Sequence, residues 1–144
     1  MSKFPVSRDS RVYVAGHSGM VGSAIHRKLK AEGFSTILTR TSAELDLRNR
    51  KMVFEFFESE KPEIVFLAAA KVGGILANDS YPADFLSDNL QIQLNVMDAA
   101  NENDCDRLVF LGSSCIYPKF APQPIPEEAL MTGHLESTNA AYAI

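Results

Sequence analysis

Three glycines, each separated from the next by two residues, follow an apolar segment and precede an amphipathic one: Gly16, Gly19 and Gly22. A strand that turns at glycines into a helix directs free backbone N–H groups and the positive end of the helix dipole at one spot, which suits a pyrophosphate. The alternative is that the glycines only form a turn, but the strand before them and the helix after them favour a dinucleotide site. We therefore predict cofactor contacts from Gly16, His17, Ser18, Gly19, Met20, Val21 and Gly22.

The end of the second apolar segment indicates which nicotinamide cofactor is used. An acidic residue there would accept the ribose hydroxyls of NAD, whereas a basic residue would meet the 2′-phosphate of NADP. Arg40 is the one charged residue in this stretch, so it favours NADP(H), with an exposed strand-end charge as the alternative; Ser42 follows it. Asp46 could accept from an adenine amino group or cap the next helix, and Leu47 lies beside it.

Polar and reactive side chains follow the fourth apolar segment, which ends at Leu111-Gly112. Ser113, Ser114 and Cys115 come directly after it. The carboxyl ends of parallel strands are where open sheets bind their ligands. The sequence therefore predicts binding residues at Leu111, Gly112 and Ser114, and also at Ala69, which ends the third apolar segment.

Strands and helices alternate along the chain, which predicts an α/β fold with a doubly wound parallel (Rossmann) sheet. The third strand is apolar at every position, as expected of a strand covered on both faces. The periodicity predicts strands over 11–15, 35–40, 64–69 and 107–112, and helices over about 20–32, 49–60 and 83–102. Residues 1–10 are expected to form a loose tail and 71–82 a glycine-rich loop, and four prolines predict an extended loop over 115–138. Residues 11–144 are thus interpreted as one dinucleotide-binding domain.

Composition narrows the functional classes. The 144 residues are 46% hydrophobic and 22% charged, with a formal net charge of −4 and no basic run, so nucleic acid is not an expected partner. The longest apolar run, Ile64–Ala70, is too short to span a bilayer, and we expect a cytoplasmic protein without membrane association. Cys105 and Cys115 lack the spacing of a ligand pair, so no metal is expected.

Taken together, these motifs resemble the extended short-chain dehydrogenase/reductases, whose catalytic side chains are Ser, Tyr and Lys. Within that family the chain is similar to the epimerase-reductases of GDP-4-keto-6-deoxy-D-mannose, over nearly its whole length. The four segments that carry the similarity are Gly16–Ser23, Ala68–Ile75, Tyr81–Phe85 and Gly112–Lys119.

The resemblance implies epimerisation at C3 and C5 of the keto sugar, followed by hydride transfer from NADPH to C4. It assigns Ser113 a hydrogen bond to the C4 oxygen, Tyr142 the proton that completes reduction, and Cys115 acid/base chemistry at carbon, with a buried apolar thiol as the alternative for Cys115. The family also pairs the tyrosine with a lysine four residues later, a position that follows the last residue, Ile144. Ser18, Ser42, Ser137 and Ala141 depart from residues common in the family.

A sheet with strand order 3-2-1-4-5-6 would reach only its fourth strand here, leaving 109–111 at an unpaired edge. The chain is accordingly interpreted as the N-terminal half of such an enzyme, dimeric at full length, and we expect it to aggregate and to lack reductase activity alone. The alternative function is a non-catalytic dinucleotide-binding regulatory module.

Overall fold

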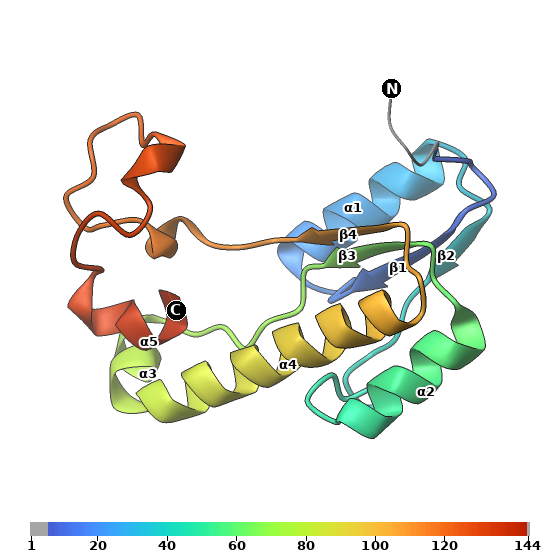
Figure 1. Ribbon diagram of the computed structural model, residues 1–144, viewed down its shortest axis with the longest axis horizontal. Helices are drawn as coiled ribbons and strands as arrows, with labels where there is room; N and C mark the ends of the chain where they lie inside the picture. The colour runs from blue at the N-terminus through green and yellow to red at the C-terminus, as the bar shows by residue number, and fades with distance from the viewer. Residues whose placement is uncertain (1–5, 144) are drawn as a thin grey trace. The chain divides into compact units, whose positions relative to one another are not determined.

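The computed structural model describes residues 6–143, without the side chain of residue 75, and contains a four-stranded parallel sheet (Figure 1). Its strands are β1 (Arg11–Ala15), β2 (Thr36–Leu38), β3 (Ile64–Leu67) and β4 (Arg107–Phe110). The α-helices are α1 (Met20–Ala31), α2 (Arg50–Glu60), α3 (Ile75–Ser80), α4 (Pro82–Glu102) and α5 (Ala140–Ala143). Three 3-10 turns follow β4: η1 (Ser114–Ile116), η2 (Glu127–Ala129) and η3 (Ser137–Asn139).

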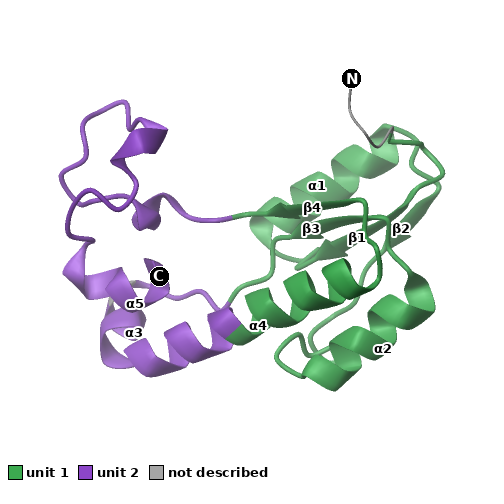
Figure 2. Ribbon diagram, viewed as in Figure 1, with its two compact units in different colours: residues 1–70, 91–111 green, residues 71–90, 112–144 purple. Residues whose placement is uncertain are grey.

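Contacts divide the chain into two compact units, drawn in different colours in Figure 2. Unit 1 contains residues 1–70 and 91–111 and therefore the whole sheet, whereas unit 2 contains residues 71–90 and 112–144. Helix α4 contributes to both. The interpretation of 11–144 as a single domain did not include this division.

Alternating side chains of the central strands face two separate cores in unit 1, which confirms the doubly wound fold. Val12 and Val14 pack with Leu29 of α1 on one face. On the other face Tyr13 and Ala15 pack with α2 and with the second half of α4, in a cluster that includes Val53, Phe56, Phe57, Val65, Val96 and Ala99. The central strands are apolar on both faces because helices cover both.

The strand order is β2-β1-β3-β4, so the predicted order, in which the fourth strand pairs with the first, is wrong. In the structure β3 pairs with β1 in register Val12↔Ile64, and β4 pairs with β3 in register Ile64↔Arg107. Both orders follow from the same alternation of strands and helices, so the sequence pattern does not distinguish them. The predicted edge position of 109–111 is nevertheless confirmed, because β4 ends the sheet among the described residues.

The predicted glycine-rich loop over 71–82 contains a short helix, α3, and the loop prediction is wrong there. Gly74 is the N-cap of α3, and the Asn78 side chain donates from Nδ2 to the carbonyls of Gly73 and Gly74 at 3.0 and 3.1 Å. The Asn78 side chain therefore stabilises this short helix, and the glycine content of the segment did not indicate such hydrogen bonds.

The segment that precedes β1 contacts the rest of unit 1 from residue 8 onward, although residues 1–10 were predicted to form a loose tail. Arg8 forms an ion pair with Glu32 at 2.8 Å and stacks over the Phe34 ring. Ser10 is buried. The first five residues of the predicted tail lie outside the described residues.

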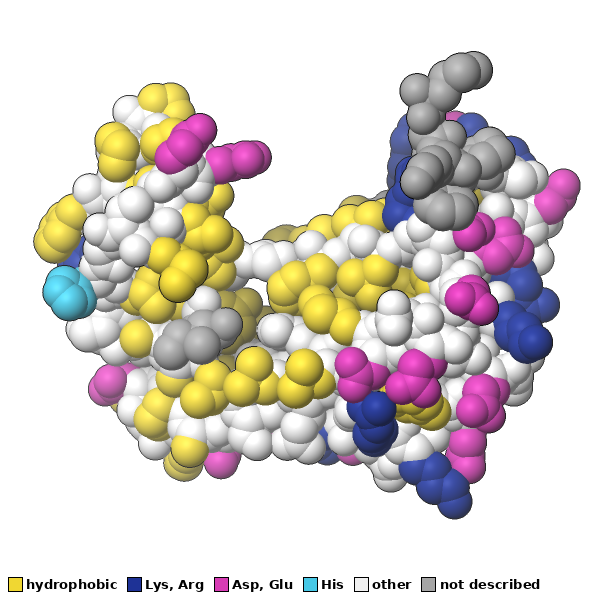
Figure 3. Space-filling view, viewed as in Figure 1, with side chains coloured by type: hydrophobic (Ala, Val, Ile, Leu, Met, Phe, Trp, Pro, Cys, Tyr) yellow, Lys and Arg dark blue, Asp and Glu magenta, His cyan; other side chains and the backbone are white. Residues whose placement is uncertain are grey.

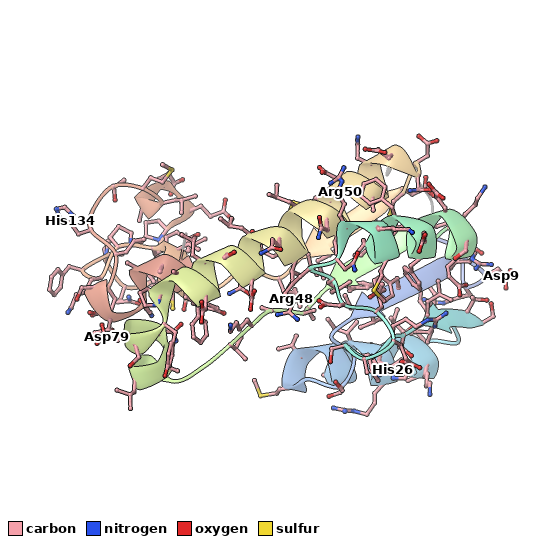
Figure 4. All side chains as sticks on the ribbon, turned by 90° about the horizontal axis from the view of Figure 1, so that it is seen from below. Asp9, His26, Arg48, Arg50, Asp79 and His134 are labelled. Carbon is pink, nitrogen blue, oxygen red and sulfur yellow. The ribbon has the colours of Figure 1, made fainter. Side chains whose placement is uncertain are left out.

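Helices α2 and α4 are joined by charge as well as by the core. Figure 4 labels Arg50 at the start of α2, where it pairs with Asp98 and Glu102 of α4. Asn49 caps α2 by accepting from the Met52 N–H at 3.2 Å. The capping alternative for Asp46 is therefore wrong, because Asn49 occupies that position.

Tyr13 is 1% exposed, and its ring lies 4.7 Å from that of Phe56 between centroids. Burial raises the pKa of the Tyr13 phenol, against a smaller lowering by Arg40.

An unfolded tyrosine ionises near pH 10, whereas folded Tyr13 stays protonated above that pH, so its contribution to stability is complete below pH 10 and is lost as pH rises. We expect the free energy of unfolding to fall by about 1.4 kcal/mol from this group by pH 11. Tyr13→Phe should remove that part of the pH dependence in urea titrations between pH 8 and 11. Parallel curves for wild type and variant would contradict the assignment.

Candidate functional site

The glycine turn lies between the carboxyl ends of β1 and β3, at the point where the order of the strands changes direction. Gly16 has φ +79°, and a Cβ added there would lie 2.7 Å from the Ala68 carbonyl oxygen and 2.8 Å from the Ala69 nitrogen. A Cβ on Gly22 would collide with the Gly16 carbonyl. Open α/β sheets bind their ligands in the crevice at such a switch point. Both glycines are therefore required by close approach of the backbone at this crevice.

Helix α1 begins without a side-chain cap. Gly19 is the N-cap residue, its N–H donates to the Gly16 carbonyl at 3.0 Å, and no acidic side chain lies in the first turn. The N–H groups of Met20, Val21 and Gly22 have no acceptor within the helix. These amides and the helix dipole form an uncompensated positive end that suits a phosphate group.

His17 and Ser18 complete the turn in different surroundings. Ser18 is exposed, whereas the Nδ1 atom of His17 is buried and has no hydrogen-bond partner among the described residues. The His17 ring lies 6.3 Å from that of His26, and burial, Lys30 and His17 lower the pKa of His26. A buried polar atom without a partner beside the glycine turn fits a site that a polar ligand completes.

Arg40 is held at the end of β2 by other groups of unit 1. Its guanidinium donates to Glu60 at 2.6 Å and to the Thr39 carbonyl at 2.8 Å, and it lies over the Phe56 ring. Glu60 also pairs with Arg11 at 3.0 Å. Arg40 and Arg11 therefore share the carboxylate of Glu60. The Arg40 side chain is about one third exposed, and it places a positive charge at this edge of the sheet.

The chain after β2 forms two local turns. Thr41 donates from its N–H and its hydroxyl to Glu44, which lowers the pKa of that carboxyl, and Ser42 is exposed in this turn. Asp46 accepts from the side chain and the N–H of Arg48, at 2.9 and 3.0 Å, and these bonds lower the pKa of Asp46. Asp46 is thus an ionised acceptor, as adenine recognition would require.

Leu47 is placed by α4. Its side chain is buried in the core, and Asn95 of α4 donates from Nδ2 to the carbonyls of Leu47 and Arg48 at 2.9 and 3.0 Å. Asn95 is itself buried. The sequence signal for these two hydrogen bonds was the position of Asn95 on α4, and by its spacing alone Asn95 could have been exposed.

Ala69 and Leu111 extend the central strands of unit 1. Ala69 packs partly against the core, and the Leu111 N–H donates to the Leu67 carbonyl at 3.1 Å, so the hydrogen bonding of β4 with β3 continues one residue past the strand. Gly112 and Ser114 are exposed in unit 2.

Ser113, Cys115 and Tyr142 all belong to unit 2, on elements that pack together: η1 follows Ser113, and α5, which carries Tyr142, packs on η1. Ser113 caps η1 by accepting from the Cys115 N–H at 3.2 Å. The three side chains are half-buried. The structure therefore brings the segment that carries Tyr142 next to the segment that carries Ser113 and Cys115, although these segments are up to 29 residues apart in the sequence.

Asn139 also joins this group, and sequence reasoning missed it. It donates from Nδ2 to Cys115 Sγ at 3.3 Å, and its Oδ1 is buried without a partner among the described residues. The available signal was its position three residues before Tyr142.

The side chains that could bind a metal ion are not clustered in the part of the chain that the structure describes. Residues 6–143 contain no group of three or more His, Cys, Asp or Glu side chains arranged to hold a metal ion. His134, labelled in Figure 4, is exposed in the loop that precedes η3. No helix of the described part combines the length and the apolar character needed to cross a membrane.

Comparisons with known proteins identify the family. The model of the NAD dependent epimerase/dehydratase family matches residues 12–144. The chain belongs to that family. It is 59% identical over 141 residues to "Putative GDP-L-fucose synthase 2" of Arabidopsis thaliana, covering 98% of this chain and 43% of that protein. It is 54% identical over 134 residues to "GDP-L-fucose synthase" of Escherichia coli (strain K12), covering 93% of this chain and 42% of that protein.

A solved structure is also similar. The GDP-mannoheptose C4 reductase MlghC from Campylobacter jejuni, with NADP bound, superposes with a TM-score of 0.92 at 40% identity, covering 96% of this chain and 44% of that one. The chain thus spans about two fifths of the length of the curated relatives it matches.

Gly22→Ala tests the close approach at the turn. Alanine in place of glycine inside a helix normally stabilises by about 1 kcal/mol, but here the new Cβ meets the Gly16 carbonyl, and we expect a net loss of about 1–3 kcal/mol. Urea denaturation followed by circular dichroism measures the difference. Ser23→Ala, in the same turn, serves as the control and should change stability by less than about 0.5 kcal/mol. A stabilised Gly22→Ala variant would show that the helix is not constrained there.

Proposed function

We infer that this chain is the dinucleotide-binding and proton-transfer part of an NADPH-dependent nucleotide-sugar epimerase-reductase. The observation that carries the inference is the glycine turn at the switch point, where neither residue 16 nor residue 22 has room for a Cβ and the α1 amides are uncapped. The proposed reaction converts GDP-4-keto-6-deoxy-D-mannose to GDP-L-fucose, and the names of the similar proteins support this substrate class.

In the proposed function, unit 1 binds the cofactor. The α1 N-terminus would hold the pyrophosphate, Arg40 the 2′-phosphate and Asp46 the adenine amino group, with Ser18, Ser42, Leu47 and Ala69 around them. The residues present fit this group, because the cradle has no side chain at Gly16 and Gly22 and His17 Nδ1 has no hydrogen-bond partner within residues 6–143. NADPH, when bound, supplies the hydride for C4.

Unit 2 would carry out the proton chemistry. A C–H bond next to a ketone loses its proton only to a base placed beside it, with donors for the enolate oxygen. Cys115 would accept or return that proton, Ser113 would donate to the C4 oxygen, and Tyr142 would protonate that oxygen as the hydride arrives. A tyrosine needs a nearby positive charge for this task, because its ordinary pKa is about 10. We propose that this charge comes from a lysine beyond residue 144.

The remaining expectations stay predictions. We propose a homodimer, supported by the exposed apolar side chains Leu90 and Leu94 on α4, where Figure 3 shows apolar side chains along the helix. We also propose a cytoplasmic location, which, like the activity, is inferred from the similarity to the relatives.

Arg40→Met tests cofactor preference. The guanidinium is the charged group that would meet a 2′-phosphate, and a charge-assisted hydrogen bond contributes about 1.5–3 kcal/mol. We therefore expect NADPH affinity to fall at least about tenfold and NADH affinity to stay constant, as measured by quenching or by calorimetry. Arg27→Met, at an exposed position of α1, is the matched control. Equal losses for NADPH and NADH would remove Arg40 from the 2′-phosphate site.

A chimera tests the activity as a whole. Residues 1–144 are joined to the C-terminal part of the Escherichia coli relative, and NADPH oxidation and GDP-L-fucose formation are measured. We expect the chimera to turn over and the 144-residue chain alone to show no turnover. Tyr142→Phe should lower the turnover of the chimera by at least about a hundredfold, in the range seen for lost acid catalysis. A chimera that binds NADPH without converting the sugar would favour the regulatory module instead.

A further inference from the structure

The carboxylate of Glu60 lies between two arginines of unit 1. Its Oε1 accepts from Arg40 at 2.6 Å, and its Oε2 accepts from Arg11 at 3.0 Å. Glu60 is the last residue of α2, Arg11 is the first residue of β1, and Arg40 follows the end of β2 by two residues. The side chain of Glu60 is 26% exposed and that of Arg40 is 34% exposed, so their contact is partly shielded from water. A carboxylate of the chain itself therefore occupies the guanidinium that would meet a 2′-phosphate.

The contacts of Arg40 draw its guanidinium back along the sheet. Strand β1 pairs with β2 at Tyr13↔Leu38, so residue 40 lies two positions further on, toward the carboxyl ends of the strands. The guanidinium carbon, however, lies 5.2 Å from the centre of the Phe56 ring, and that ring lies 4.7 Å from the ring of Tyr13. The charged group is thus held over a ring that packs against the middle of β1, whereas the glycine turn follows the carboxyl end of that strand.

Negative charge distinguishes Glu60 from the other described groups that contact Arg40. The Thr39 carbonyl, at 2.8 Å, and the aromatic ring beneath the guanidinium are both neutral. A second carboxylate, that of Glu44, accepts from the N–H and the hydroxyl of Thr41. An arginine paired with a carboxylate attracts a phosphate less strongly, because its charge is already compensated and the carboxylate repels the phosphate. Glu60 is accordingly the group that a 2′-phosphate has to displace.

We propose that Glu60 is a positioning residue that holds Arg40 away from the cofactor site, and that a bound 2′-phosphate takes the guanidinium over from Glu60. The proposal rests on the proposed function, in which Arg40 meets that phosphate. Arg11 makes the exchange possible, because it remains paired with Glu60 after Arg40 has left. NADPH then binds against the loss of one ion pair, whereas NADH, which has no 2′-phosphate, leaves the pair intact. Glu60 therefore lowers the preference for NADPH that Arg40 creates.

Glu60→Gln tests the exchange, because it removes the charge and keeps an amide oxygen that still accepts from Arg40. Nucleotide affinity is measured by calorimetry for the 144-residue chain and for the chimera with the Escherichia coli relative. We expect the dissociation constant for NADPH to fall about fivefold, the size of one partly exposed ion pair, and that for NADH to change by less than about twofold. In an Arg40→Met background, Glu60→Gln should change NADPH affinity by less than about twofold, because the guanidinium is absent.

Glu32→Gln is the matched control. The Glu32 carboxylate also lies between two cations, with Arg8 at 2.8 Å and Lys28 at 2.6 Å. Glu32 is the C-cap residue of α1 and therefore lies at the end of that helix opposite to the glycine turn. Because charges more than a Debye length apart are largely screened, this substitution should change neither affinity by more than about twofold.

Three results would overturn the proposal. Unchanged or weaker NADPH binding by the Glu60→Gln variant, with NADH binding retained, would show that Glu60 does not compete for Arg40. An equal gain for both nucleotides, or the same gain in the Arg40→Met background, would show that the charge of Glu60 acts without Arg40. A loss of both affinities would show that Glu60 only maintains the fold. If neither the unsubstituted chain nor the chimera binds either nucleotide, the proposed function is contradicted, and this proposal with it.

Discussion

The carboxyl ends of β1 and β3 lie so close together that the residue leaving β1 can carry no side chain. Gly16 takes a left-handed conformation against the Ala68 carbonyl, and Gly22 brings the first turn of α1 against the Gly16 carbonyl. This close approach places the uncapped first turn of α1 beside the carboxyl ends of β1 and β3, where the strand order changes direction. A larger residue at either position would move the helix and the amides together.

The residues around the glycine turn are held by a few polar contacts as well as by the apolar cores. Asn95 joins α4 to the carbonyls after Leu47, and Glu60 pairs with both Arg11 and Arg40. Asn95 is buried, so losing it would leave two carbonyls without their donor and would cost more than the bonds contribute. The two ion pairs of Glu60 are partly exposed and contribute less. Within unit 1, the chain after Leu47 and the Arg40 side chain are thus positioned by Asn95 and Glu60.

Unit 2 is stabilised differently. Among its described residues few apolar side chains are buried, with Phe85, Ala129 and Ala143 among them. Asn89 both donates to and accepts from the backbone of Lys71, at 3.0 and 2.7 Å. A segment with few buried apolar contacts opens more readily than a packed core. The proposed proton-transfer residues therefore lie on the less densely packed part of the chain.

The sequence by itself determined the fold class and the position of the glycine turn, and it supplied Ser113, Cys115 and Tyr142 as candidate reactive residues. These follow from local rules: apolar periodicity defines strands and helices, three glycines between a strand and a helix define the turn, and Ser113 and Cys115 follow a strand directly. Each of these features depends on interactions among residues that are close together in the sequence, so the sequence pattern predicts it.

Only the tertiary structure decided the strand order, the helix within 71–82, and the partners of Arg40, Asp46 and Cys115. Strand order depends on which way each crossover runs, and alternating strands and helices are compatible with several orders. The partners depend on contacts between distant segments, such as Asn139 with Cys115, 24 residues apart. The sequence does not show the partner of Asn95 or of Asn139, because each donates to a group that the fold brings to it from a distant segment.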